Sequence, residues 1–279
     1  MKLGYVSHGL PDWLQYVNKY GFDGIELYVG CNESPFGVPE HDMDIVKRYA
    51  EDFKKQGINI LTVQYADNLY ERFGGEIAPY VRVISQTADV AKLLGTDIIA
   101  LNAYAPFPAS DADRRAFISK LYKELGEMCE DKGVRIAVEN CPHEGRNFVY
   151  NLDAMEYFLG KVNDSIGLEL DPSHMYWLGC DYIEAARRFG SRVFCVHAKD
   201  TEILHRRMGE VGILYNDEWW RYRLPGWGKV DFKSMFTELC VHGFDGPVNI
   251  EHEDPVCMDA LFGEGLKKGK QYLEQILFN

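Results

Sequence analysis

The chain has 279 residues, of which 46% are hydrophobic and 26% charged, a balance typical of a globular protein with a large core. Its formal net charge of −13 argues against binding to nucleic acids and to anionic membrane surfaces. The sequence shows neither a signal peptide nor a membrane span, and its seven cysteines lack CxxC spacing, so we expect a cytoplasmic protein with reduced thiols.

Short apolar runs alternate with longer amphipathic stretches eight times along the chain. We expect strands near residues 3–7, 24–29, 58–64, 97–102, 135–140, 166–171, 193–199 and 248–253. Helical patterns lie near residues 11–20, 43–56, 77–94, 111–131, 152–161, 181–189, 231–242 and 260–276. Eight strand–helix units predict a single (β/α)8 TIM barrel, with an open doubly wound sheet as the structural alternative.

Glycines recur at the expected helix ends, where a left-handed cap would return the chain to the sheet. They are Gly21, Gly57, Gly95, Gly133 and Gly243. This repeated punctuation supports the division into strand–helix units.

The connection near residues 200–230 is the longest, and we expect a lid or specificity loop there. Its segment 217–227 holds three tryptophans, a tyrosine and two arginines. Trp220 could stack on a sugar ring, while Arg221 and Arg223 could bind its oxygens. The alternative is a loop that packs on its own barrel or on a second subunit, so a homo-oligomer stays possible.

Polar residues close the last four expected strands, at the end of the barrel where functional side chains gather. They are Glu139, Asp171, His197 and Glu251. A single acid in such a place is more often a helix cap or an ion-pair partner, but four in succession predict a site for one divalent metal ion. Three carboxylates and one imidazole favour Mn2+, which we expect, or Mg2+, Co2+ or Zn2+.

The same segments carry motifs that resemble a known family. The motifs are Glu139-Asn-Cys-Pro, Asp171-Pro-Ser-His174-Met, Val-His197-Ala-Lys199-Asp200, Gly226-Trp-Gly228-Lys-Val-Asp231-Phe and Ile-Glu251-His-Glu. Together they resemble the sugar phosphate isomerase/epimerase superfamily, the xylose isomerase-like TIM barrels, across residues 1–279 as one domain.

The resemblance implies roles for individual residues. It implies metal ligation by the four strand-end residues, acid/base catalysis by Glu139 and Glu251, and substrate contact by His174. The chain departs from the ketose 3-epimerases of this superfamily, which carry an arginine shortly after the metal histidine, where Lys199 and Asp200 follow here. The acidic chain also lacks the basic surface that DNA-repair members need.

Three further residues have two interpretations each. Lys199 has the same strand parity as His197 and could polarise a substrate oxygen, or it could form an ion pair with Glu169 or another strand carboxylate. His8 and Glu26, on the first two expected strands, could reach the substrate or be satisfied polar residues inside the barrel.

A metal bound to a ketone and its neighbouring hydroxyl stabilises an enediolate, and two flanking carboxylates could then move a proton between faces. We therefore expect an isomerase or epimerase acting on a small carbohydrate, a sugar or a sugar-like ketose or inosose. The alternative is a metal-dependent deglycosidase or lyase that cleaves a 3-oxo-glycoside by elimination.

Overall fold

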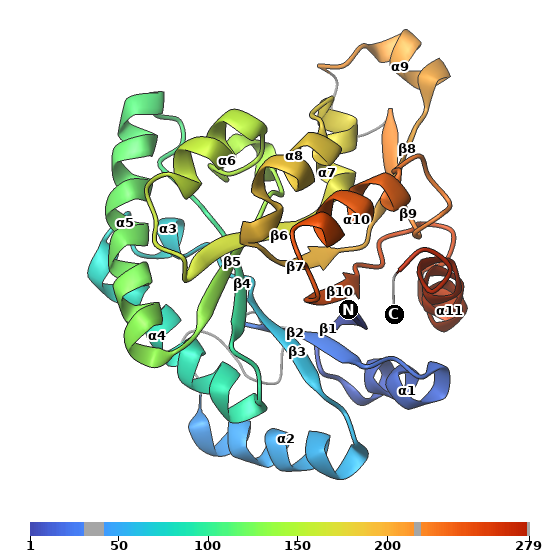
Figure 1. The fold of residues 1–279 in the computed structure, drawn as a ribbon, viewed down its shortest axis with the longest axis horizontal. Coiled ribbons are helices and arrows are strands. Elements are labelled where there is room, and N and C mark those ends of the chain that lie inside the picture. The colour runs from blue at the N-terminus through green and yellow to red at the C-terminus, as the bar shows by residue number, and fades with distance from the viewer. Residues whose placement is uncertain (31–41, 215–218, 278–279) are drawn as a thin grey trace.

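The computed structural model describes residues 1–30, 42–214 and 219–277 (Figure 1). Eight parallel strands close into a barrel in the order β1-β10-β7-β6-β5-β4-β3-β2. These strands are β1 (Lys2–Ser7), β2 (Gly24–Val29), β3 (Ile60–Tyr65), β4 (Ile98–Asn102), β5 (Arg135–Glu139), β6 (Ile166–Leu170), β7 (Val193–His197) and β10 (Pro247–Ile250). The predicted TIM barrel is confirmed, and an open sheet is excluded because β1 pairs with both β2 and β10.

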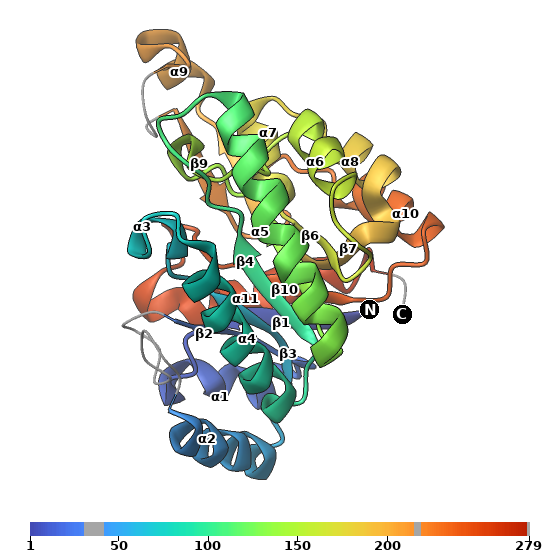
Figure 2. The same cartoon turned by 90° about the vertical axis from the view of Figure 1, so that its left-hand side faces the viewer.

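Helices surround the barrel, and α4 and α5 pack side by side along it (Figures 1 and 2). The helices of eight or more residues are α1 (Pro11–Tyr20), α2 (Met43–Gln56), α4 (Ile77–Leu94), α5 (Asp111–Lys132), α6 (Leu152–Leu159), α8 (Tyr182–Phe189), α10 (Phe232–Val241) and α11 (Phe262–Leu273). Shorter ones are α3 (Leu69–Arg72), α7 (Pro172–Leu178), α9 (His205–Val211), η1 (His143–Gly145), η2 (Gly190–Arg192) and η3 (Asp259–Leu261). Within the described ranges, none of these helices combines the length and apolarity that crossing a bilayer requires.

The predicted glycine caps are confirmed. Gly21, Gly57, Gly95 and Gly133 each follow a helix with φ between 64° and 90°, and Gly243 has φ 76°. A side chain other than hydrogen is strained in this left-handed conformation, which explains the residue type.

The strands are buried on both faces, because helices cover the outside and side chains fill the inside. Every residue of β3, β4, β6 and β7 is buried. Most are Val, Ile, Leu or Ala, but the barrel also encloses the polar side chains of Glu26, Thr62, Glu169, His197 and Asn249. Buried polar groups of this kind need partners, so their contacts locate the chemistry of the barrel.

The connection near residues 200–230 differs from the predicted loop. It contains an antiparallel hairpin of β8 (Asp200–Ile203) and β9 (Trp220–Arg223), with α9 between the two strands. In both views α9 projects beyond the barrel (Figures 1 and 2). The prediction missed the hairpin because its strands are short and are separated by 16 residues. Asp217 and Glu218 of the aromatic segment lie outside the described residues.

Candidate metal centre

The four predicted metal ligands lie at one end of the barrel. Glu139 and His197 are the last residues of β5 and β7, while Asp171 and Glu251 directly follow β6 and β10. The predicted strands thus extended slightly too far at these two positions. Parallel strands end at the same edge of the barrel, so the four side chains converge there.

One ring nitrogen of His197 faces the three acids. Its Nδ1 lies 3.3 Å from Glu139 Oε1, 3.2 Å from Glu251 Oε2 and 4.0 Å from Asp171 Oδ2. Ligand atoms that share one ion at roughly 2.1 Å lie about 3–4 Å from one another. Atoms of the same three acids and of His174 all lie within 4.8 Å of one another, so the described residues offer enough ligands for one divalent cation. The role of His197 as a ligand stays a prediction.

Asp171 divides its two carboxylate oxygens between structure and site. Its Oδ1 accepts from Ser173 N at 2.8 Å and caps helix α7, as the helix-cap interpretation predicts. Its Oδ2 is buried and accepts no hydrogen bond from the described residues. Lys199 Nζ lies 3.2 Å from this oxygen and balances part of its charge, and a bound cation would supply a further partner.

The other ring nitrogen of His197, Nε2, contacts the buried acids Glu26 and Glu169 inside the barrel. Nε2 lies 2.8 Å from Glu26 Oε1, and the second Glu26 oxygen accepts from Asn249 Nδ2 at 2.8 Å. Glu169 Oε1 lies 3.3 Å from the same nitrogen and accepts from Cys195 Sγ at 3.1 Å. An Nε2–H that donates to Glu26 leaves the Nδ1 lone pair facing the three acids, the usual arrangement around a metal-binding histidine.

Two asparagines that the sequence analysis did not single out fix the backbone of the site. Asn140 Nδ2 donates to the Asp171 carbonyl, and Asn140 Oδ1 accepts from the Asp171 amide, each at 2.8 Å. Asn147 Nδ2 donates to the Glu139 carbonyl at 2.8 Å. The position of Asn140 directly after Glu139 was the available signal.

Lys199 lies beside the acids and has strong partners. Its Nζ donates to Glu251 Oε2 and, at 3.0 Å, to Glu253 Oε2. It also lies 3.2 Å from Asp171 Oδ2 and 3.3 Å from His174 Nε2. The ion-pair interpretation of this lysine is therefore observed, with acids other than Glu169, and the ammonium group still lines the cavity above the site.

His174 and Tyr222 lie next to Lys199 in the lining of the cavity. His174 Nε2 lies 3.3 Å from Asp171 Oδ2, and its Nδ1 lies 2.7 Å from Tyr222 Oη. The Tyr222 ring packs against Lys199, with Nζ 4.3 Å from the ring centre. The sequence analysis did not identify Tyr222 as a site residue, although it is two residues from Trp220 on a strand and so shares its face.

The environments shift several pKa values. Burial raises the pKa of Glu251, but Lys199 and His197 outweigh burial and hold the pKa well below its usual range. Burial raises the pKa of Glu169 well above its usual range, and the nearby Glu26 adds to the effect. These environments favour the ionised form of Glu251, which faces the cavity, and the neutral form of Glu169 beneath the histidine.

A cavity of about 250 Å³ borders the site, and of the four predicted ligands Glu139 and Glu251 line it, whereas Asp171 and His197 do not. It is lined by Tyr28, Gln64, Ala66, Asn102, Tyr104, Glu139, Cys141, His143, His174, Lys199, Tyr222, Glu251 and Glu253. Tyr28 Oη donates to Glu251 Oε1 at 3.2 Å, and Gln64 Nε2 donates to Glu139 Oε2 at 3.4 Å. The lining is rich in hydrogen-bonding groups, as a polyhydroxylated ligand requires.

Four predicted substrate-binding residues lie outside this lining. Trp220 stacks on Trp177 with ring centres 4.5 Å apart, and the His8 ring lies 5.0 Å from that of Tyr28. Arg221 pairs with Glu202 at 2.8 Å, and Arg223 pairs with Glu202 and Asp254. Their contact with substrate remains a prediction, and Glu26 lies beneath His197 rather than in the cavity.

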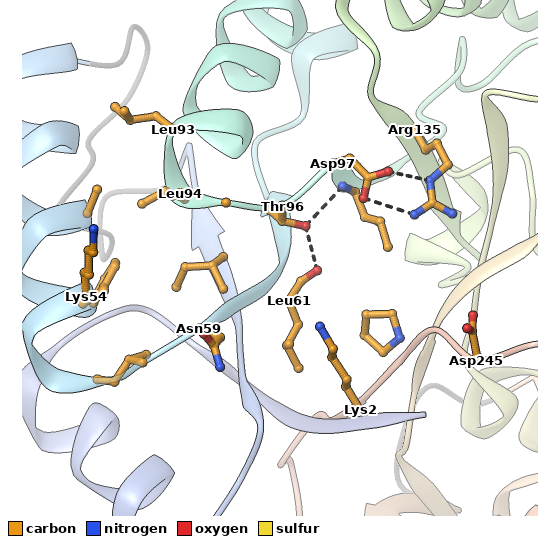
Figure 3. A pocket seen from close by; sticks show the side chains of 17 residues that line it. Lys2, Lys54, Asn59, Leu61, Leu93, Leu94, Thr96, Asp97, Arg135 and Asp245 are labelled. Carbon is orange, nitrogen blue, oxygen red and sulfur yellow. Dashed lines mark hydrogen bonds and ion pairs between the residues drawn. The ribbon is translucent and has the colours of Figure 1, made fainter. Parts of the chain in front are cut away.

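A larger hollow, about 660 Å³, lies at the opposite end of the barrel (Figure 3). Arg135 Nε pairs with Asp97 Oδ2 at 3.0 Å there, and Thr96 Oγ1 donates to the Leu61 carbonyl at 2.8 Å. None of the described residues around it belongs to a His, Cys, Asp and Glu cluster that could hold an ion. We therefore assign the chemistry to the smaller cavity.

Comparison with curated proteins finds relatives along nearly the whole chain. An uncharacterized protein YfiH of Bacillus subtilis is 27% identical, with 91% of this chain and 93% of the relative covered. An inosose isomerase of Halalkalibacterium halodurans is 23% identical, with coverage of 95% and 90%. An inosose dehydratase of Glaesserella parasuis is 24% identical, with coverage of 98% and 95%.

Solved structures share the fold. The crystal structure of IOLI protein with a bound zinc atom has a TM-score of 0.76 at 22% identity, covering 99% of this chain and 98% of that one. A mannonate dehydratase of Streptococcus suis has a TM-score of 0.77 at 13% identity, with coverage of 99% and 92%. The family model "Xylose isomerase-like TIM barrel" matches residues 14–276. The predicted resemblance is confirmed, and the chain belongs to the xylose isomerase-like TIM barrel family.

Proposed function

We propose that this protein is a divalent-metal-dependent isomerase that moves a proton in a sugar-like ketose, with an inosose as the first candidate. The observation that carries the proposal is the convergence of three carboxylates on His197 Nδ1 beside a polar cavity that Glu139 and Glu251 line. A divalent ion bound there would polarise a ketone and its neighbouring hydroxyl and so stabilise an enediolate. The relatives named inosose isomerase support the substrate class.

Glu139 and Glu251 are the proposed proton carriers. They come from β5 and β10, which are separated in the barrel by β6 and β7, so they approach the cavity from different sides. One carboxylate can take a proton from a substrate carbon while the other returns one to the neighbouring position. Lys199 and His197 lower the pKa of Glu251, which keeps this carboxylate ionised.

The test is deuterium exchange. The protein, loaded in turn with Mn2+, Zn2+, Co2+ and Mg2+, is incubated in D2O with a panel of ketoses and inososes, and exchange and products are followed by NMR. We expect deuterium in a substrate whose carbon skeleton is retained. Glu139→Gln should abolish exchange, while Asp245→Asn, in the hollow at the opposite end, should leave it unchanged. A protein that binds none of these ions refutes the proposal.

A second candidate is elimination through the same enediolate. Lys199 and His174 lie 3.3 Å apart in the lining of the cavity, where a group that carries a proton could protonate a departing oxygen. Relatives named inosose dehydratase also match the chain. Including 3-oxo-glycosides in the panel separates the two reactions, because elimination releases water or an aglycone and isomerisation releases neither.

A further inference from the structure

The hairpin formed by β8 and β9 carries one side chain into the cavity wall. Tyr222 pairs with Thr201 across the hairpin, and its hydroxyl approaches His174. The two residues on either side of it, Arg221 and Arg223, form ion pairs with Glu202. Strand alternation therefore separates a structural face, which holds the hairpin, from the face that carries Tyr222.

Lys199 determines which atoms donate and which accept in the hydrogen bonds that connect it to His174 and Tyr222. Its ammonium group has three hydrogens and can only donate. Glu251 Oε2, Glu253 Oε2 and His174 Nε2 accept them, while Asp171 Oδ2 forms no hydrogen bond with the described residues. His174 Nε2 must then present a lone pair, so in the neutral ring the hydrogen resides on Nδ1.

The protonated ring gives the same result at Nδ1. An imidazolium carries hydrogen on both nitrogens. In either state Nδ1–H donates to Tyr222 Oη across 2.7 Å, so the tyrosine oxygen accepts this bond.

The Tyr222 hydroxyl hydrogen is consequently left for another acceptor. None of the acceptors in the described ranges takes it, and Tyr222 lines the cavity. Its oxygen lies beyond the imidazole ring, on the side away from the nitrogen that approaches Asp171 and Glu139. A ligand oxygen that meets this hydrogen therefore belongs to a carbon remote from the acids.

We infer that Tyr222 donates a hydrogen bond to a hydroxyl oxygen of a cyclic polyol, remote from the reacting carbons, and that His174 fixes the direction of this bond. The inference rests on the proposed function for the substrate class. It makes Tyr222 a specificity-determining residue, contributed by the hairpin rather than by the barrel.

The test uses binding, which does not depend on turnover. Inositol has no ketone, so calorimetry on the Zn2+-loaded protein measures its affinity alone. Tyr222→Phe keeps the ring against Lys199 but removes the hydroxyl, and we expect affinity to fall about tenfold. The matched control is Tyr182→Phe on α8. It removes a tyrosine hydroxyl that accepts a hydrogen bond from Asp231 N at 2.8 Å, and it should leave the inositol affinity unchanged.

The second readout is the tautomer of His174. Long-range proton–nitrogen spectra of 15N-histidine-labelled, Zn2+-loaded protein should show hydrogen on Nδ1, with His174→Asn identifying the signal. A bare Nδ1, or equal inositol affinity in Tyr222→Phe and wild type, overturns the inference, as does a wild type that binds no inositol. Lack of deuterium exchange with every ketose would instead count against the proposed isomerase, so the two failures are distinguishable.

Discussion

The two sides of the His197 ring carry the same kinds of residue in different circumstances. On the Nδ1 side, Glu139, Asp171 and Glu251 lie beneath a cavity, and Asp171 Oδ2 lacks a hydrogen-bond donor among the described residues. On the Nε2 side, Glu26 and Glu169 have no exposed surface and bond to Asn249 and Cys195.

Composition alone would therefore suggest a metal site on each side of this ring, since Glu139, Asp171 and Glu251 form one possible ligand group with His174, and Glu26 and Glu169 form another with His197. The difference lies in access, because Glu169 Oε2 on the enclosed side also lacks a hydrogen-bond partner among the described residues. The side that borders an open cavity can receive an ion, while the enclosed side orients the ring. The following variants test this division, from the largest expected effect to the smallest.

Asp171→Asn should greatly weaken metal binding on the Nδ1 side of His197. It removes the negative charge of the oxygen that lacks a donor but keeps the size of the side chain, so Zn2+ or Mn2+ affinity measured by calorimetry should fall at least about 100-fold. Asp245→Asn, in the hollow at the opposite end, is the control and should bind metal as wild type does. Unchanged affinity in Asp171→Asn would place the ion elsewhere.

Glu26→Gln should weaken metal binding less, by roughly 10–100-fold, because it disturbs the orientation of the ring and leaves every proposed ligand in place. Its amide can accept from His197 Nε2 or from Asn249 Nδ2, but not from both through one oxygen. Glu169→Gln is the matched variant, and it should lower the metal affinity less than Glu26→Gln does. The reason is distance, since Glu169 lies 3.3 Å from His197 Nε2 and Glu26 lies 2.8 Å from it. Equal losses would contradict the orienting role of Glu26.

Asp254→Asn probes how the hairpin is tied to the mouth of the barrel. Asp254 is fully buried and accepts from Arg223 Nε at 2.8 Å and from the Leu224 amide at 3.1 Å. Burial raises its pKa, but Arg223 and backbone amides outweigh burial and lower it below the usual value. We expect a loss of about 1–3 kcal/mol in the free energy of unfolding at pH 7, measured with urea.

The pH dependence of this loss follows from the sign of the shift. Because the pKa is lower in the folded than in the unfolded state, the stabilisation is complete above the ordinary aspartate pKa of about 3.9 and is lost as pH falls through the folded value. The gap between wild type and Asp254→Asn should therefore narrow below that pH. A gap that stays constant would show that the charge of Asp254 is not its source.

Cys195→Ala should have the smallest effect, and on stability only. It removes the thiol that donates to Glu169 Oε1 on the enclosed side. Cys129→Ala deletes an equally buried thiol on α5, for which the structure shows no such bond, and serves as the volume-matched control. We expect Cys195→Ala to lose about 0.5–1.5 kcal/mol more than the control, with metal affinity unchanged in both. A change in metal affinity would mean that the thiol supports the His197 ring through Glu169.

The barrel and the convergence of Glu139, Asp171, His197 and Glu251 could be predicted because both depend on local patterns. Each strand is an apolar run, and each of these residues ends or directly follows one. Asp171 also shows that the helix-cap and metal-ligand interpretations were compatible, since they use different oxygens of one carboxylate.

The support for the site could not be predicted in the same way. Whether Glu26 faces substrate or His197 depends on the register of strands whose residues are 171 positions apart in the chain. The place of Tyr222 depends on its pairing with Thr201 in a hairpin interrupted by α9. Lys199 had the correct parity, but its partners come from segments after β6 and β10. Such contacts follow from tertiary packing rather than from periodicity.

The closure of the barrel by β10 has a consequence for synthesis. Because β10 lies between β1 and β7, β1 leaves the ribosome well before β10 and has both of its neighbours only after β10 has been synthesised. Glu251 follows that last strand, so a nascent chain that ends before Pro247 has three of the four proposed ligands and an open sheet. Metal capture would thus report that the barrel has been completed, and ribosome-bound chains of increasing length should gain metal affinity only after residue 251 has emerged.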